Sequence, residues 1–134
     1  MHETGALTSW WSQRPRRNPA GIGVTGDTKP ARPIGGAWAQ HGAVWEEGCS
    51  FASWADHAVP AHVGRLLAYA TAPGNRTPSQ RALILGAMTV RTLPAQYHGC
   101  APTLAGLEGT WAVPGKGYAD KLAAIMTALR GTHE

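Results

Sequence analysis

Apolar residues at helical spacing predict a helix that begins after Ser53. Ser53 is expected to cap it, with Asp56 three residues later in the capping-box position. Pro60 falls inside the apolar pattern, so the helix should bend or restart there. The run 72–75 (Ala-Pro-Gly-Asn) ends the pattern. The apolar face of this helix is predicted to consist of Val59, Val63, Leu66, Leu67 and Ala70.

Thr77 and Pro78 predict the start of a second helix, because threonine caps a helix well and proline suits the first helical position. Gln80 follows three residues after the cap, and Leu93 with Pro94 should stop the helix. Its apolar positions are Leu83, Ile84, Ala87 and Met88.

The last helix is expected to start at Tyr118 and to stop at Gly131, a typical C-terminal residue. Between Leu93 and Gly117 the many glycines and prolines allow only short helical turns, around Tyr97 and Leu104. The core positions of the last helix are predicted to be Tyr118, Leu122, Ile125, Met126 and Leu129.

The first half of the chain has a different pattern. From Gly35 to Ser53 apolar and polar residues alternate imperfectly between glycines, which predicts two short strands in a hairpin. Residues 1–35 are rich in Gly, Pro and Arg and are expected to form ordered loop. With 134 residues the chain fits one domain, so the predicted fold class is α+β, mainly helical, with a small β-hairpin lobe.

The net charge of +4 favours a polyanionic partner such as nucleic acid, anionic lipid or wall polymer. No stretch is long and apolar enough for a membrane span, and no signal peptide pattern is present. Cys49 and Cys100 lack zinc-ribbon spacing and are expected to be free thiols, with a disulfide as the alternative. The histidines form no metal-binding pair, and Gly21, Gly23 and Gly26 lack the strand-then-helix context of a nucleotide site, so no metal or cofactor is predicted.

Several motifs together resemble the peptidoglycan glucosaminidases of glycoside hydrolase family 73, a lysozyme-like group. The first is the run His-Glu-Thr-Gly at 2–5, followed by Ser9-Trp10-Trp11 and by Asn-Pro-Ala-Gly-Ile-Gly at 18–23. The second block lies at 51–69, and the third, from Trp111 to Leu122, is similar to the closing motif of the family. The three blocks occur in the family order and span most of the chain.

The resemblance implies a lysozyme-like fold and cleavage of the glycan strand at N-acetylglucosamine, outside the cell, in the bacterial wall or by a phage lysin. A muramidase or a lytic transglycosylase is the alternative enzyme class. Glu3 matches the glutamate that acts as general acid, and an apolar wall around such a carboxyl raises its pKa into a useful range. No cofactor is implied. The candidate substrate-binding residues are Trp10, Trp11, Asn18, Gly21, Tyr97, Trp111 and Tyr118, of which Tyr118 also fits a core position.

A second carboxylate usually completes such a site. Asp27, Glu46 and Glu47 are the candidates, and the resemblance favours Glu46 and Glu47 because the family carries an acid in its hairpin. The 2-acetamido group of the substrate can replace the second acid in some enzymes, so this alternative stays open.

The sequence departs from the family at its start. The catalytic glutamate of the family ends a long helix, whereas only Met1 and His2 precede Glu3 here. We therefore expect a missing N-terminal segment, or a homo-oligomer that covers the exposed apolar faces. Two other functions remain as alternatives: a non-catalytic peptidoglycan-binding module of the same fold, and a small nucleic-acid-binding protein that uses the basic run 14–17 beside Trp10 and Trp11.

Overall fold

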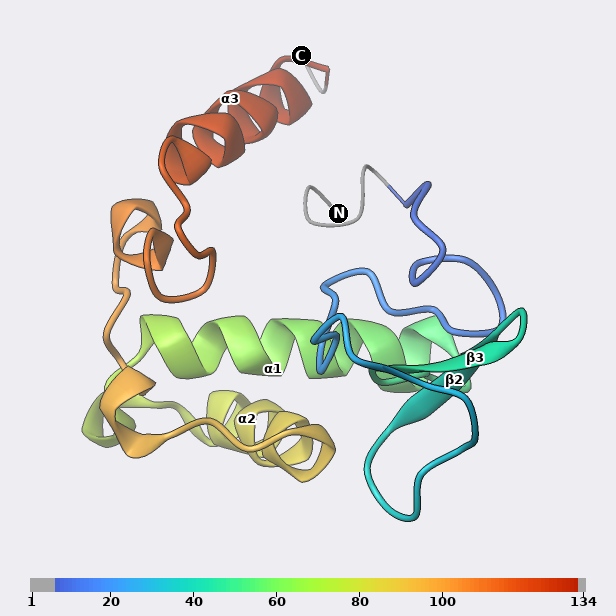
Figure 1. The fold of residues 1–134 in the computed structure, drawn as a ribbon. Helices are drawn as coiled ribbons and strands as arrows, with labels where there is room; N and C mark the ends of the chain where they lie inside the picture. Colours follow the sequence, from blue (N-terminus) through green and yellow to red (C-terminus); the bar gives the residue numbers. More distant parts are fainter. Residues whose placement is uncertain (1–6, 133–134) are drawn as a thin grey trace.

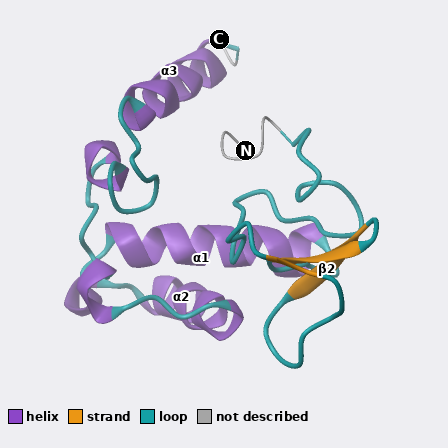
Figure 2. Ribbon diagram, in the orientation of Figure 1, coloured by secondary structure: helices purple, strands orange, loops and turns teal. Residues whose placement is uncertain are grey.

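The computed structural model describes residues 7–132 and contains a small sheet and three helices (Figure 1). Figure 2 shows that loops form most of the chain before the hairpin, as the sequence predicts. The mixed helix and sheet content confirms the α+β class. The strands are β1 (Thr28–Lys29), β2 (Trp38–His41) and β3 (Val44–Glu47), and the helices are α1 (Val59–Ala70), α2 (Pro78–Val90) and α3 (Tyr118–Gly131). Single helical turns lie at Trp54–Ala58, Pro73–Asn75, Ala95–Tyr97 and Leu104–Leu107.

The predicted hairpin is confirmed as β2 and β3. Gln40 pairs with Trp45, and the two-residue turn contains Gly42, whose φ of +60° suits glycine. Strand β1 was not predicted; it pairs antiparallel with β3 and gives the order β1-β3-β2. Two residues without an alternating pattern carry too little signal to be recognised as a strand.

Capping chemistry marks the start of the helical turn before α1 and the start of α2, as predicted. The Ser53 hydroxyl accepts a hydrogen bond from the Asp56 backbone N–H at 3.1 Å. A π-helical turn follows, and regular α-helix begins at Val59, so the expected restart near Pro60 is confirmed. Both bonds of the capping box between Thr77 and Gln80 are present at the start of α2.

Helices α1 and α2 pack closely through small residues. The buried positions of α1 are Ala61, Gly64, Ala68 and Tyr69. A Cβ on Gly64 would collide with the Leu83 carbonyl of α2, so only glycine permits this approach.

The predicted apolar face of α1 is therefore wrong in part. Val59 and Val63 are 48% and 40% exposed, and Ala70 is exposed as well. Leu66 and Leu67 pack against the main core as predicted. The difference arises because the close approach of the α2 backbone leaves room only for small side chains. A pattern of apolar spacing takes no account of side-chain size.

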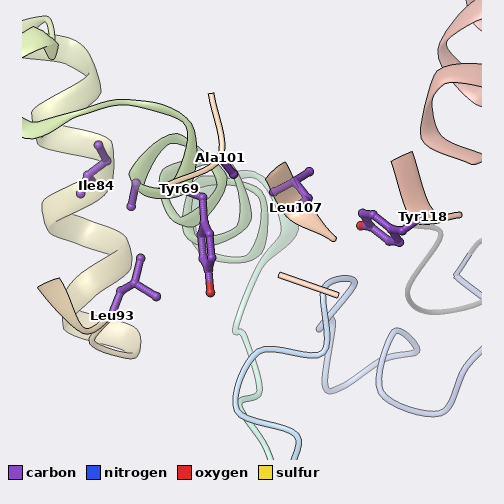
Figure 3. Packing of buried hydrophobic residues seen from close by; sticks show 7 residues of the cluster. Tyr69, Ile84, Leu93, Ala101, Leu107 and Tyr118 are labelled. Carbon is purple, nitrogen blue, oxygen red and sulfur yellow. The ribbon is translucent and has the colours of Figure 1, made fainter. Parts of the chain in front are cut away.

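The main hydrophobic core runs from α2 to the start of α3. Figure 3 shows Ile84 and Leu93 beside Tyr69, with Leu107 and Tyr118 continuing the row toward α3. A second cluster under the N-terminal loop joins Ile22, Cys49, Phe51, Ala58 and Ala61. The two clusters fix the N-terminal loop and the 101–118 segment on opposite parts of α1.

Helix α3 extends away from α1 and α2 (Figure 1). Tyr118 is buried and Leu122 packs against the core, as predicted for this helix. The prediction is wrong for the remaining positions, because Ile125, Met126 and Leu129 are 42%, 42% and 57% exposed. The second half of α3 thus presents an apolar surface that no other described element covers.

Candidate functional site

Asn18 shapes the glycine-rich loop at the centre of the candidate site. Its side chain has no exposed surface. The Asn18 Oδ1 accepts from the Ile22 N–H at 2.8 Å, and Nδ2 donates to the carbonyls of Ile22 and Cys49 at 2.9 and 3.0 Å. Asn18, predicted to bind substrate, thus holds the loop and has no surface with which to contact a ligand.

This loop exposes the backbone of Gly21. Gly21 has a φ of +64°, and a Cβ built on it would meet nothing within 4 Å. The backbone therefore faces open space, where a ligand can come close to it. The contact with substrate that the glycine-rich motif predicts for Gly21 stays a prediction.

The space beside Gly21 is a groove of about 210 Å³ between the N-terminal loop and α1. This volume is below the roughly 300–1,000 Å³ of pockets for drug-sized ligands, so the groove suits one ring or one chemical group. Its lining residues are Ala20, Gly21, Ile22, Gly23, Val24, Arg65, Tyr69, Arg91, Trp111 and Ala112. The structure thus brings Gly21 and Trp111, ninety positions apart in sequence, to one site.

Trp111 is held at the groove by aromatic contacts from α1. Its ring stacks with His62 at a centroid distance of 5.8 Å and an interplanar angle of 9°. The Tyr69 ring meets it edge to face at 5.4 Å and 81°. The segment that carries Trp111 is also anchored, because the Glu108 Oε1 accepts from the Ala119 N–H in the first turn of α3 at 3.0 Å. Trp111 is thus a fixed aromatic wall of the groove, and its predicted contact with a sugar stays a prediction.

The hairpin acids lie on β3 and both have hydrogen-bond partners. Glu46 pairs with His41 across the turn, with 2.6 Å between Oε1 and Nδ1. Glu47 accepts a hydrogen bond from the Thr25 hydroxyl. Asp27, the third candidate, is exposed in the loop before β1 and accepts through its backbone carbonyl from the Glu47 N–H at 3.0 Å.

Trp10 joins the hairpin through a stack of side chains. Its ring stacks on His41 at 4.1 Å, and the Arg16 guanidinium lies 3.7 Å from the Trp10 ring centroid. Burial lowers the pKa of Arg16, and the negative charge of Glu46 opposes this shift. The structure therefore brings Trp10 and Glu46 into one cluster, in which Trp10 contacts the side chains of Trp11, His41 and Arg16.

Trp11, Tyr97 and Tyr118 contribute to the framework. The Trp11 ring packs directly on Gly48, where a Cβ would collide with it. Tyr97 packs against the main core, with its ring 6.2 Å from that of Tyr69. Tyr118 is 7% exposed and belongs to the same core. Of its two predicted roles, it therefore takes the core position and does not stack on a sugar.

Glu3, the predicted general acid, lies outside the described residues, as do His2, Thr4 and Gly5. No group of three or more His, Cys, Asp or Glu residues suited to a metal occurs in the range 7–132. Cys49 and Cys100 are free thiols, as expected. Across the described helices, none is long and apolar enough to cross a membrane.

Sequence reasoning missed two arginines and a tyrosine that line the groove. Arg65 and Tyr69 are four residues apart on α1, so helical spacing alone could have placed them on one face. Arg91 follows α2 and reaches the groove only through the packing of α2 on α1, which no local pattern encodes.

No family model, curated protein or solved structure matches the chain. The resemblance carried by the sequence motifs therefore supports a function only together with the chemistry of the groove.

Proposed function

We propose that this domain is a peptidoglycan hydrolase of lysozyme-like architecture that cleaves the wall glycan at N-acetylglucosamine. The observation that carries the proposal is the groove, which combines the open backbone of Gly21, the aromatic wall of Trp111 and Tyr69, and two arginines. Sugars are commonly bound by an aromatic face together with hydrogen-bonding backbone groups. The motif order in the sequence supports the same substrate. Such an enzyme works outside the cell, in the wall or as a lysin delivered by a phage.

In the proposed reaction Glu3 donates a proton to the oxygen of the leaving sugar. A carboxyl group can do this near neutral pH when an apolar environment raises its pKa. The second role, that of base or nucleophile, falls to Glu46 or Glu47, or to the 2-acetamido group of the substrate. This chemistry requires no metal or cofactor.

The position of the hairpin acids bears on the second catalytic role. Neither Glu46 nor Glu47 lines the groove beside Gly21, although Glu47 lines an adjoining cavity with Arg91. Substrate assistance needs no second acid in the groove. A non-catalytic module that holds wall glycan in the same groove needs none either, and this is the second candidate function.

Nucleic acid is the weaker alternative because the basic run is partly used inside the fold. Arg16 donates through Nε to the Trp10 carbonyl at 2.6 Å, and Arg17 donates through Nη1 to the carbonyls of Pro15 and Phe51. These bonds fix the two guanidinium groups beside the backbone and reduce their reach toward phosphates.

Lysis of purified bacterial walls, measured as loss of turbidity beside a pull-down on the same walls, tests the proposal. We expect Glu3→Gln to lower the lysis rate by a factor of about a hundred or more while wall binding persists. Asp27→Asn, which removes an exposed loop charge, is the matched control and should have a milder effect.

The outcomes separate the candidates. Lysis retained in Glu3→Gln would refute the assignment of Glu3. Wall binding without lysis in the parent chain would favour the binding module. Binding to DNA with a steep salt dependence, and none to walls, would favour the nucleic-acid alternative.

A further inference from the structure

Two arginines meet at one end of the groove. Arg65 belongs to α1 and Arg91 follows the last residue of α2. The Arg65 Nη1 donates to the Arg91 backbone carbonyl at 2.9 Å, which brings the two residues together. The Arg91 Nη1 reaches the glycine loop and lies 3.3 Å from the position that a Cβ on Gly23 would occupy. Both arginines line the same groove as Trp111.

The pair places two positive charges close together. Burial lowers the pKa of Arg65, Tyr69 opposes the shift, and the charge of Arg91 lowers the pKa further. Among residues 7–132, the ion pairs within 4.0 Å include no carboxylate for either guanidinium. Glu47 lines an adjoining cavity with Arg91 but accepts its hydrogen bond from Thr25. Arg65 is partly buried and Arg91 is exposed. Two like charges held close together without a carboxylate partner favour the binding of an anion.

The groove is shaped to admit that anion next to a sugar. A guanidinium presents its N–H groups as a planar fork that matches the two oxygens of a carboxylate. The neighbouring Gly21 has no side chain, and the space above it is open. Trp111 and Tyr69 supply an apolar wall on the other side. The groove therefore holds a site for a ring and a site for a negative group within one small volume.

We propose that Arg65 and Arg91 bind a carboxylate carried by the glycan, in the groove where Trp111 contacts the sugar ring. The inference rests on the proposed function and refines its substrate class. Every second sugar of the wall glycan carries a lactyl ether whose carboxyl group is free or bears a peptide with carboxylates of its own. Chitin has the same backbone without these groups. The domain should therefore bind acidic wall glycan in preference to neutral chitin.

The test uses Arg91→Gln, which keeps the backbone carbonyl that Arg65 contacts and removes one charge. Arg130→Gln is the matched control, because Arg130 is exposed on α3 and the substitution changes the charge equally. The probes are N-acetylmuramic acid, N-acetylglucosamine and inorganic phosphate, titrated into the labelled full chain. Binding is followed by NMR signals of the arginine side chains, and equal unfolding midpoints confirm that the variants fold.

We expect the parent chain and Arg130→Gln to bind N-acetylmuramic acid about tenfold or more tightly than N-acetylglucosamine, and Arg91→Gln to bind the two sugars equally. Equal binding of both sugars by the parent chain would overturn the inference and leave the proposed function standing. The inference is also overturned if phosphate binds more tightly than N-acetylmuramic acid, since the pocket would then serve a phosphate polymer. Binding of neither sugar, with no binding to walls, would instead reject the proposed function itself.

Discussion

Replacing Asn18 by alanine tests whether one buried amide holds the glycine loop in shape. The wild-type side chain makes three hydrogen bonds, two with the peptide groups of Ile22 and one with the Cys49 carbonyl. The Ile22 carbonyl keeps a second donor, because it also accepts from the Cys49 N–H at 3.0 Å. Asn18→Ala therefore leaves two buried groups without a partner, the Ile22 N–H and the Cys49 carbonyl.

The expected loss of stability follows from these two groups. An unsatisfied buried donor or acceptor costs about 1–3 kcal/mol, so Asn18→Ala should lower the free energy of unfolding by about 2–6 kcal/mol. Domains of this kind have total stabilities of about 5–15 kcal/mol, so the loss would be a large share of the total. Asn18→Asp should not rescue the protein, because one carboxylate oxygen would face the Ile22 and Cys49 carbonyls where the amide N–H₂ now donates.

Urea unfolding, followed by tryptophan fluorescence, measures this loss. Asn75→Ala is the matched control, because Asn75 is exposed in a 3₁₀ turn and its replacement should change stability by no more than about 0.5 kcal/mol. If Asn18→Ala unfolds at the same urea concentration as Asn75→Ala, the amide does not hold the loop and the argument is refuted. If a water molecule replaces part of the amide, the loss of unfolding free energy should lie near 2 kcal/mol, the lower end of the range of about 2–6 kcal/mol.

Three further predictions concern packing, pH and association. Gly64→Ala should destabilise the protein by about 1–3 kcal/mol, because the new Cβ would collide with the α2 backbone. Gly86→Ala places a Cβ that meets no atom within 4 Å and should stabilise the protein by about 0.5–1 kcal/mol. Urea unfolding that ranks the two variants in the opposite order would contradict this packing. Burial raises the pKa of the Cys49 thiol above its ordinary 9.0, so its contribution to stability is complete below pH 9.0 and is lost as the pH rises through the folded-state pKa. The unfolding free energy of the wild type should therefore fall more steeply above pH 9.0 than that of Cys49→Ala, and equal slopes would refute this. The exposed apolar face of α3 should cause self-association. Replacing Ile125 and Leu129 together by glutamine should shift the sedimentation coefficient toward that of the monomer, and an unchanged coefficient would show that this face is not the contact.

Local chemistry made several elements predictable from the sequence. The helical turn before α1 and the start of α2 depend on hydrogen bonds between a cap and a residue three positions later, so Ser53 and Thr77 mark them directly. The hairpin was predictable for the same reason, since Gly42 and the alternation around it act within a few residues.

The buried faces of the helices were less predictable because they depend on what each helix packs against. Val59 and Val63 match an apolar face by spacing, yet the close approach of α2 buries Gly64 instead, and Ala61 is buried in the second cluster under the N-terminal loop. Leu129 at the end of α3 is exposed because no other described element packs on it. The apolar pattern of α3 cannot show whether such a neighbouring element exists.

The candidate site divides in the same way. Gly21 and Trp111 were identified from motifs, and the fold places both on the groove. Asn18 came from the same motif but points inward, since an asparagine in a tight loop bonds to backbone as readily as to a ligand. Arg91 carries no local signal, because its position at the groove is a product of tertiary packing.

The groove is assembled from three segments, and a side chain bonded to backbone fixes each of them. Asn18 fixes the glycine loop, Arg65 joins α1 to the end of α2, and Glu108 ties the Trp111 segment to α3. The groups proposed to contact the ligand are mostly different ones: the backbone of Gly21, the ring of Trp111 and the guanidinium of Arg91. Substitution of Arg91 should therefore change ligand binding while stability stays nearly constant. Replacement of Trp111, which packs against the main core, should lower stability as well. Substitution of Asn18 or Glu108 should reduce both together, because the site exists only while its segments are held.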